Sequence, residues 1–158
     1  MSITKNIIQN ENNEDLNSSE SIRKFLTFVS DKLFFGIDAS YVTEIIINHN
    51  ITFLPMVSHY IKGIINLRGQ IIPIVDIRLR MGKPAYEEQN GTNCIIVLNI
   101  DSIMIGILVD SVRQVLDVDT SRISPPTANN CEELVNGMIT LSDGSTMLVL
   151  DQIALSRS

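Results

Sequence analysis

An internal repeat limits what this chain can fold into more than any other feature of the sequence. When residues 25–46 are moved along by 70 positions, the pattern Asp-x-x-x-x-Gly-Ile that begins at Asp31 falls on the same pattern at Asp101. The repeat continues with an offset of 74 and then 75, which places residues 59–76 on residues 133–151. The additional residue falls in a turn, where hairpins tolerate changes of length. The sequence therefore predicts two similar modules that follow one another along the chain.

The composition predicts that both modules are built of β-strands. The 158 residues include 25 isoleucines and 11 valines but only four alanines, and β-branched side chains favour pleated sheet over helix. The residues of each copy predict a strand, a tight turn, a second strand and then a short helical segment. The helical segment would span residues 40–44 in the first copy and 110–114 in the second. Ser111 and Gln114 have the spacing of a helix capping box, which favours a helix start there. About five short strands in each copy suit a small closed or nearly closed barrel, since closure hides strand edges.

Two strand segments are apolar on both faces, at residues 71–75 and 103–109. A strand with one face in water would alternate between apolar and polar residues. We therefore expect two five-stranded barrels that pack on a shared hydrophobic core, in a mainly β protein with short helices. Subdomain one would span about residues 25–82 and subdomain two about 94–151, with strand exchange between the two left open. Pro73 predicts an edge position or a bulge, because proline cannot donate to a ladder.

A polar N-terminal segment precedes the repeat. Residues 1–20 hold one lysine and four carboxylates, so this segment carries −3 of the chain's net charge of −6. Its asparagines and serines leave too little apolar surface to offset the entropy that ordering would cost. Residues 1–21 are therefore expected to form a disordered acidic tail, and residues 22–155 the folded body. A second polar stretch, residues 82–93, is expected to link the two modules.

The charge and the composition argue against several classes of protein. A net charge of −6 and a pI of about 4.8 disfavour nucleic-acid binding, which needs clustered Lys and Arg, and anchoring on an anionic membrane. No apolar run is long enough to cross a membrane or to form a signal peptide, so the sequence predicts no membrane insertion and a cytoplasmic protein. Cys94 and Cys131 lack the spacing of a metal site and suit a reducing compartment.

The sequence offers little that could perform catalysis. His49 and His59 are the only histidines, and neither lies in a nucleophile motif. The chain also lacks the glycine-rich loops that bind nucleotide phosphates. We therefore expect a binding protein with no catalytic residue, no metal site and no cofactor. A ligand-binding or enzymatic barrel with His49 or His59 in its pocket is the alternative.

One predicted hairpin has the geometry of a recognition site. Residues 60–78 comprise an apolar strand, a turn at residues 66–69 and a second apolar strand, with Arg68 at the tip. An arginine on a rigid hairpin can bind a carboxylate, and the rigid support lowers the cost of ordering it. The alternative is a solvated arginine in a turn that needs Gly69 for its positive φ.

The same segment resembles a known family signature. The residues from Gly63 to Ile77, GIINLRGQIIPIVDI, are similar to the signature of the CheW family of bacterial chemotaxis coupling proteins. The similarity extends to Gly36-Ile37-Asp38, to residues 42–45 and to residues 105–110, and it covers about residues 23–155. The resemblance implies two SH3-like five-stranded β-barrels joined through a hydrophobic core, which agrees with the repeat.

The resemblance also implies a function. The family also includes the regulatory domain of the CheA histidine kinase and the adaptor half of CheV, and a stand-alone adaptor fits this chain best. The resemblance thus implies a non-catalytic adaptor that bridges the cytoplasmic tip of methyl-accepting chemoreceptors and the regulatory domain of CheA, within receptor arrays at the inner face of the membrane. The positions that match receptor-binding positions of the family are Val42, Glu44, Gly63 and Arg68, with Asn66 and Leu67 shaping the turn. Core packing of Val42 and a solvated Glu44 are the alternatives.

A run of three isoleucines, Ile45, Ile46 and Ile47, is the candidate kinase-binding surface. Successive residues of a strand point to opposite faces, so at least one of the three points away from its own barrel. Contact with the kinase would cover that residue, and burial between the two modules is the alternative. An adaptor in a receptor pathway unrelated to motility would carry the same motifs.

Overall fold

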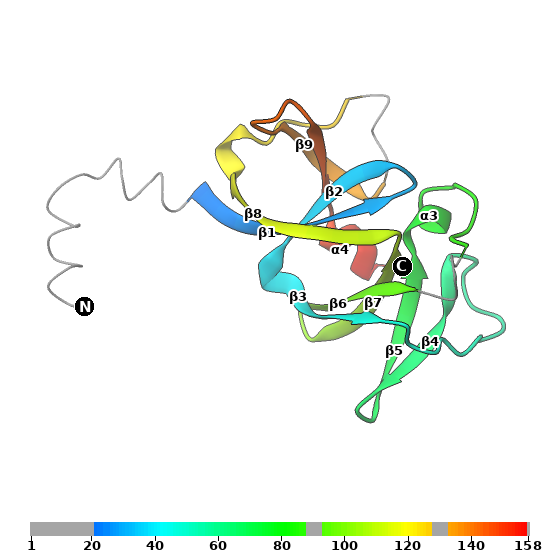
Figure 1. Ribbon diagram of the computed structural model, residues 1–158. Coiled ribbons are helices and arrows are strands. Elements are labelled where there is room, and N and C mark those ends of the chain that lie inside the picture. The colour runs from blue at the N-terminus through cyan, green and yellow to red at the C-terminus, as the bar shows by residue number, and fades with distance from the viewer. Residues whose placement is uncertain (1–20, 88–92, 128–132, 158) are drawn as a thin grey trace, which may run out of the picture.

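The computed structural model describes residues 21–87, 93–127 and 133–157, which form ten β-strands and a few short helices (Figure 1). The strands are β1 (Ile22–Ser30), β2 (Leu33–Asp38), β3 (Val42–Ile47), β4 (Ile61–Leu67), β5 (Gln70–Asp76), β6 (Cys94–Ile100), β7 (Ile103–Val109), β8 (Ser111–Asp119), β9 (Val135–Thr140) and β10 (Thr146–Leu150). The helices are η1 (Ala39–Tyr41), α3 (Ile77–Arg80), η2 (Thr120–Arg122) and α4 (Gln152–Ser156). The expected tail, apart from Ser21, lies outside the described residues.

The repeat begins with two matching hairpins, β1–β2 and β6–β7. In each, both residues of the connecting turn have positive φ: 50° and 65° at Asp31 and Lys32, and 50° and 69° at Asp101 and Ser102. This is the two-residue turn whose twist matches that of the flanking strands, and aspartate tolerates its left-handed backbone. The recurring aspartate in the sequence therefore marks the same turn in both copies.

The two repeats exchange these hairpins. The first sheet has the strand order β8-β1-β2-β10-β9 and the second sheet the order β3-β6-β7-β5-β4. Each sheet thus combines one N-terminal hairpin with three strands of the other repeat, through a parallel contact between β2 and β10 or between β7 and β5. Figure 1 shows the first sheet in the upper part of the molecule and the second in the lower part. The predicted ranges 25–82 and 94–151 therefore describe the two repeats, whereas each sheet contains strands from both ranges.

A shared core joins the two sheets. It takes buried side chains from both, and within it Phe28 and Phe35 are fully buried and stack with ring centroids 5.3 Å apart. On β6, Ile96 and Leu98 point into this shared core. Ile95 and Val97, on the other face of the strand, pack in a separate core that belongs to the second sheet. The predicted mainly β fold with burial on both strand faces is confirmed. No ladder joins β8 to β9 or β3 to β4 among the described residues, so each five-stranded barrel is partly open.

The helical segments predicted within each repeat are wrong. Residues 111–119 form strand β8, and only residues 39–41 make a single 3-10 turn before β3 begins. The capping pattern at residue 111 does not start a helix, because this segment pairs with β1 as a strand. The buried hydroxyl of Thr27 stabilises the pairing through two hydrogen bonds to the backbone of Gln114. It donates to the Gln114 carbonyl at 2.6 Å and accepts from the Gln114 N–H at 3.0 Å.

The edge position predicted for Pro73 is wrong, whereas the alternative, a bulge, lies one residue further along, where the β4–β5 ladder shifts register between the partners of Ile74 and Val75. Strand β5 lies between β7 and β4 and is not an edge strand. Ile64, which faces Pro73 in the ladder, exchanges both its backbone hydrogen bonds with Thr52 on its other side. The ladder from β5 to β7 begins only at Ile74. Proline is tolerated in this inner strand because no neighbouring strand needs the missing N–H.

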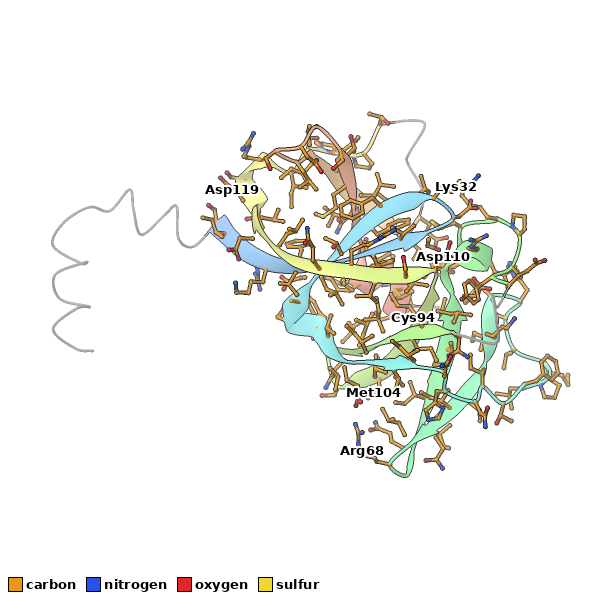
Figure 2. All side chains as sticks on the ribbon, viewed as in Figure 1. Lys32, Arg68, Cys94, Met104, Asp110 and Asp119 are labelled. Atoms are coloured by element: carbon orange, nitrogen blue, oxygen red, sulfur yellow. The ribbon has the colours of Figure 1, made fainter. Side chains whose placement is uncertain are left out.

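A group of charged side chains fixes the sheets relative to each other at one end of the molecule. Arg78 on α3, next to the second sheet, donates through Nε to Asp110 at 3.1 Å and through Nη2 to the other carboxylate oxygen. Its Nη1 also lies 3.5 Å from Asp31 in the turn of the first sheet, and Lys83 Nζ lies 3.3 Å from the same carboxylate. The hydrogen bonds that Arg78 donates to Asp110 raise the pKa of Arg78. Asp110 is visible beside α3 in Figure 2.

Truncation of Phe28 tests the shared core. Phe28→Ala should lower the free energy of unfolding by about 3–5 kcal/mol, because it leaves a cavity between the two sheets. The loss should affect both sheets in one cooperative transition, which urea unfolding followed by amide NMR signals from each sheet would measure. The control Val115→Ala, at a site 52% exposed on β8, should change the stability little. Survival of one sheet after the other has unfolded would contradict a shared core.

Removal of residues 1–20 tests the expected tail. The ladder between β1 and β8 begins at Ile22 opposite Asp119, so every strand pair remains in a chain that starts at residue 21. We expect the free energy of unfolding to stay within about 0.5 kcal/mol of the full chain, as is usual for surface changes. Thermal and urea unfolding of both chains measure this. A loss of several kcal/mol would mean that the tail packs on the body.

Candidate functional site

The β4–β5 hairpin presents Arg68 at its tip. Arg68 and Gly69 form a two-residue turn with φ of 52° and 88°. The side chain of Asn66 closes this turn, because its Oδ1 accepts the Gly69 N–H at 2.9 Å. The β6–β7 turn uses the same device, with Asn99 Oδ1 accepting the Ser102 N–H at 3.0 Å. Asn66 therefore sets the backbone conformation from which Arg68 projects.

Arg68 forms an ion pair with Glu44, so two of the candidate receptor residues meet although they lie 24 positions apart. Glu44 is on β3 and Arg68 follows β4, which are the two outer strands of the second sheet. The arginine side chain is 71% exposed and the glutamate 27%. An exposed pair of this kind contributes at most about 1 kcal/mol to stability. Its main effect is to position the guanidinium at the end of the hairpin (Figure 2).

The neighbouring candidates support this arrangement from beneath. Val42 is half-buried and packs against the shared core. A β-bulge separates it from Glu44, since the ladder to β6 shifts register between these two residues. Leu67, the residue directly before Arg68, packs against the core of the second sheet and anchors the end of β4 from which the turn begins.

Gly63 is buried and has a packing function. A Cβ atom at this position would lie 2.2 Å from the carbonyl oxygen of Thr52 and 2.9 Å from the Ile51 side chain. Residues 51–52 therefore approach β4 more closely than any side chain at position 63 would allow. Gly63 can affect binding only through the position of that segment.

The three isoleucines of β3 separate into two groups. Ile46 packs against the core of the second sheet. Ile45 and Ile47 point outward and are 40% and 65% exposed. They line a shallow groove together with Tyr86 and Val112, which come from other parts of the chain. Two apolar side chains on this outer strand are thus available to a partner.

The two histidines considered for catalysis, His49 and His59, line the same groove beside β4. His49 Nδ1 lies 3.1 Å from the carbonyl oxygen of Asn50, and His59 packs edge-on against Tyr60. Within the described ranges, no three His, Cys, Asp or Glu side chains are grouped so that they could hold a metal ion. Burial raises the pKa of the Cys94 thiol, which disfavours the reactive thiolate.

The structure adds two residues that no sequence motif indicated. Phe53 is 76% exposed and Met56 is fully exposed, on the loop between β3 and β4. Their only sequence signal is their apolar character on either side of Pro55, in a segment that also contains polar residues. Among the residues described, no helix has the length and apolar character needed to cross a bilayer.

Comparison with known proteins identifies the family. The family model of the CheW-like domain matches residues 24–158. The chain is 33% identical to the chemotaxis protein CheW of Klebsiella aerogenes, over 83% of this chain and 79% of that protein, and 29% identical to CheW of Thermotoga maritima, over 84% and 88%. The crystal structure of the scaffolding protein TtCheW from Thermoanaerobacter tengcongensis superposes with a TM-score of 0.74 at 29% identity, and the match covers 82% of this chain and 88% of that one. The chain belongs to the CheW-like domain family.

Proposed function

We propose that the protein is a non-catalytic adaptor that couples methyl-accepting chemoreceptors to the CheA histidine kinase in chemotaxis. Two CheW relatives match four-fifths or more of this chain, and the similar solved structure is that of a scaffolding protein. The observation that carries the proposal is the Glu44–Arg68 ion pair, which joins two of the positions that the family resemblance indicated for receptor binding. Binding to receptor tips would place the protein in the cytoplasm, within arrays at the inner face of the membrane.

The receptor-binding surface in this proposal centres on Arg68. The guanidinium has one partner, Glu44, and most of its surface remains open to solvent. A receptor carboxylate or carbonyl group can bind its free N–H groups, since a guanidinium offers five donors in a fixed plane. Val42 and Leu67 support the two strands from which this surface is built.

The kinase-binding surface in this proposal is the outer face of β3. Ile45 and Ile47 expose apolar area that a β-barrel of the kinase regulatory domain would cover. Glu44 lies on the same strand, one residue before Ile45. The two partners would therefore contact adjacent residues of one strand, and receptor state could change the kinase only if these contacts differ in free energy between the signalling states.

Substitution of Arg68 tests the receptor surface. Arg68→Ala should weaken binding to a receptor-tip fragment by about 1–3 kcal/mol, the loss expected for a charge-assisted contact, while binding to the CheA regulatory domain stays the same. Arg68→Lys should recover only part of the affinity, because an ammonium cannot reproduce the planar fork. Titration calorimetry against each partner measures both effects.

A matched control for this experiment is Arg113→Ala, which removes another exposed arginine, on β8 of the first sheet. It should leave both affinities unchanged. Equal losses toward the two partners on Arg68→Ala, or a lower melting temperature that accounts for the loss, would mean that Arg68 supports the hairpin and that the receptor binds elsewhere.

Substitution of Ile47 tests the kinase surface. Ile47→Ser should lower the affinity for the CheA regulatory domain by about 1–3 kcal/mol, because covering an isoleucine removes apolar area from water. Receptor-tip binding should not change. The control Val115→Ser alters another exposed apolar side chain, on the first sheet, which is 52% exposed against 65% for Ile47. If the control lowers kinase affinity as much as Ile47→Ser does, the outer face of β3 is not the kinase surface.

A further inference from the structure

We infer that a groove beside β4, the lysine groove, is an additional docking surface for a partner segment in which a carboxylate lies next to an exposed apolar side chain. The side chains that define it are His49, Ile51, Phe53, His59, Lys62 and Leu79. The groove lies on the side of β4 opposite β5, since Thr52 and Ile64 pair there. Its lining does not include Glu44, Arg68, Ile45 or Ile47, although Asn93 also lines the groove beside Ile45 and Ile47.

The charge of the lysine groove is opposite to that of the molecule. Lys62 provides its one formal charge, and no acidic residue lines the groove within the described part of the chain. None of the ion pairs among the described residues includes Lys62. The whole chain has a net charge of −6, so most of its surface repels an acidic segment. An acidic partner would therefore be directed to this groove by charge complementarity.

The loop that carries Phe53 from the lysine groove supplies the apolar part of the site. Phe53 is 76% exposed, and the following residues Leu54, Met56 and Val57 also expose apolar side chains, with Met56 fully exposed. Several large apolar side chains on one loop mark an interaction site, because isolated exposed residues are normal but clusters are not. Aromatic side chains are frequent anchors of interfaces. The loop thus favours a partner with an apolar side chain beside its acidic group.

The groove is held in shape before any partner binds. The carboxamide of Asn93 accepts the His49 N–H at 3.2 Å and donates to the His49 carbonyl at 3.0 Å. On the other wall, Thr52 and Ile64 exchange backbone hydrogen bonds of 2.8 and 2.9 Å. A site with fixed walls loses little conformational entropy on binding.

The internal repeat shows that the fold does not require this chemistry. The bridge between Ser124 and Met138 in the first sheet corresponds to the bridge between Thr52 and Ile64. A groove beside that bridge has Asn136 at the position of Lys62, and its lining includes the carboxylate of Asp38, which pairs with Arg23. The positive charge is thus a property of one groove and not of the scaffold.

Two labelled peptides test this inference with the full chain. They are fluorescein-labelled 12-residue peptides with a central Leu-Phe pair, and they differ only in whether glutamates or lysines flank that pair. We expect the glutamate peptide to bind with saturation and about tenfold more tightly than the lysine peptide, as measured by fluorescence anisotropy. Chemical-shift changes in the ¹⁵N-labelled protein should centre on Phe53, His49 and Lys62.

Three variants locate the binding site. Lys62→Gln and Phe53→Ser should each weaken binding of the glutamate peptide about fivefold or more, with unchanged melting temperatures. Lys32→Gln removes an exposed lysine from the β1–β2 turn and should have no effect. Equal binding of the two peptides, no saturation up to about 1 mM, or shift changes centred on Arg68 or Ile47 would overturn the inference. Since no receptor or kinase is used, its failure would leave the adaptor proposal untouched.

Discussion

Every surface of this protein depends on the core that the two sheets share. Strands such as β6 place alternate residues into that core and into their own sheet, so both faces are buried. Such strands cannot present a binding face. Exchange of the β1–β2 and β6–β7 hairpins makes the arrangement obligatory, because neither sheet has five strands without the other repeat. The parts of the second sheet that remain for recognition are its outer strand β3, the tip of β4–β5 and the loop before β4.

These remaining parts have different chemistry within a short distance along the chain. Glu44 directs a carboxylate toward Arg68, whereas Ile45 and Ile47 expose apolar area on the other face of β3. Alternation along one strand is sufficient to produce both surfaces. The bulge between Val42 and Glu44 shifts the register at the point where the strand leaves the shared core. An adaptor built in this way needs no moving part to hold two partners, only an outer strand that presents a different side chain on each face.

Much of the fold could be predicted from the sequence because the relevant signals are local or repeated. The recurring aspartate marked the two tight turns, and the doubly apolar strands indicated the shared core. The capping pattern at Ser111 was misleading because a local hydrogen-bonding preference competes with pairing to a strand 87 residues away, held by Thr27. Pro73 was misplaced because the ladder from β5 to β7 starts one residue later. The exposed Phe53 could not be foreseen, since exposure depends on how the loop folds back on β4.

The site was less predictable than the fold, because it brings together residues from separate strands. Family resemblance indicated both Glu44 and Arg68, but only the closeness of the two outer strands shows that they form one ion pair. Gly63 belonged to the same set, and its buried contact with Thr52 gives it a packing function that no motif reveals. Residues that act through packing and residues that touch a partner look alike in a sequence signature.

The most direct test of the central claim is a reconstituted assay of CheA autophosphorylation in vesicles that carry chemoreceptors. The account predicts that the wild-type chain makes the kinase responsive to the receptor, and that Arg68→Ala and Ile47→Ser each abolish most of this response. It also predicts that an equal mixture of the two variants does not restore the response, because both surfaces must belong to one molecule. Full recovery in the mixture would contradict the account, since the two surfaces would then act independently.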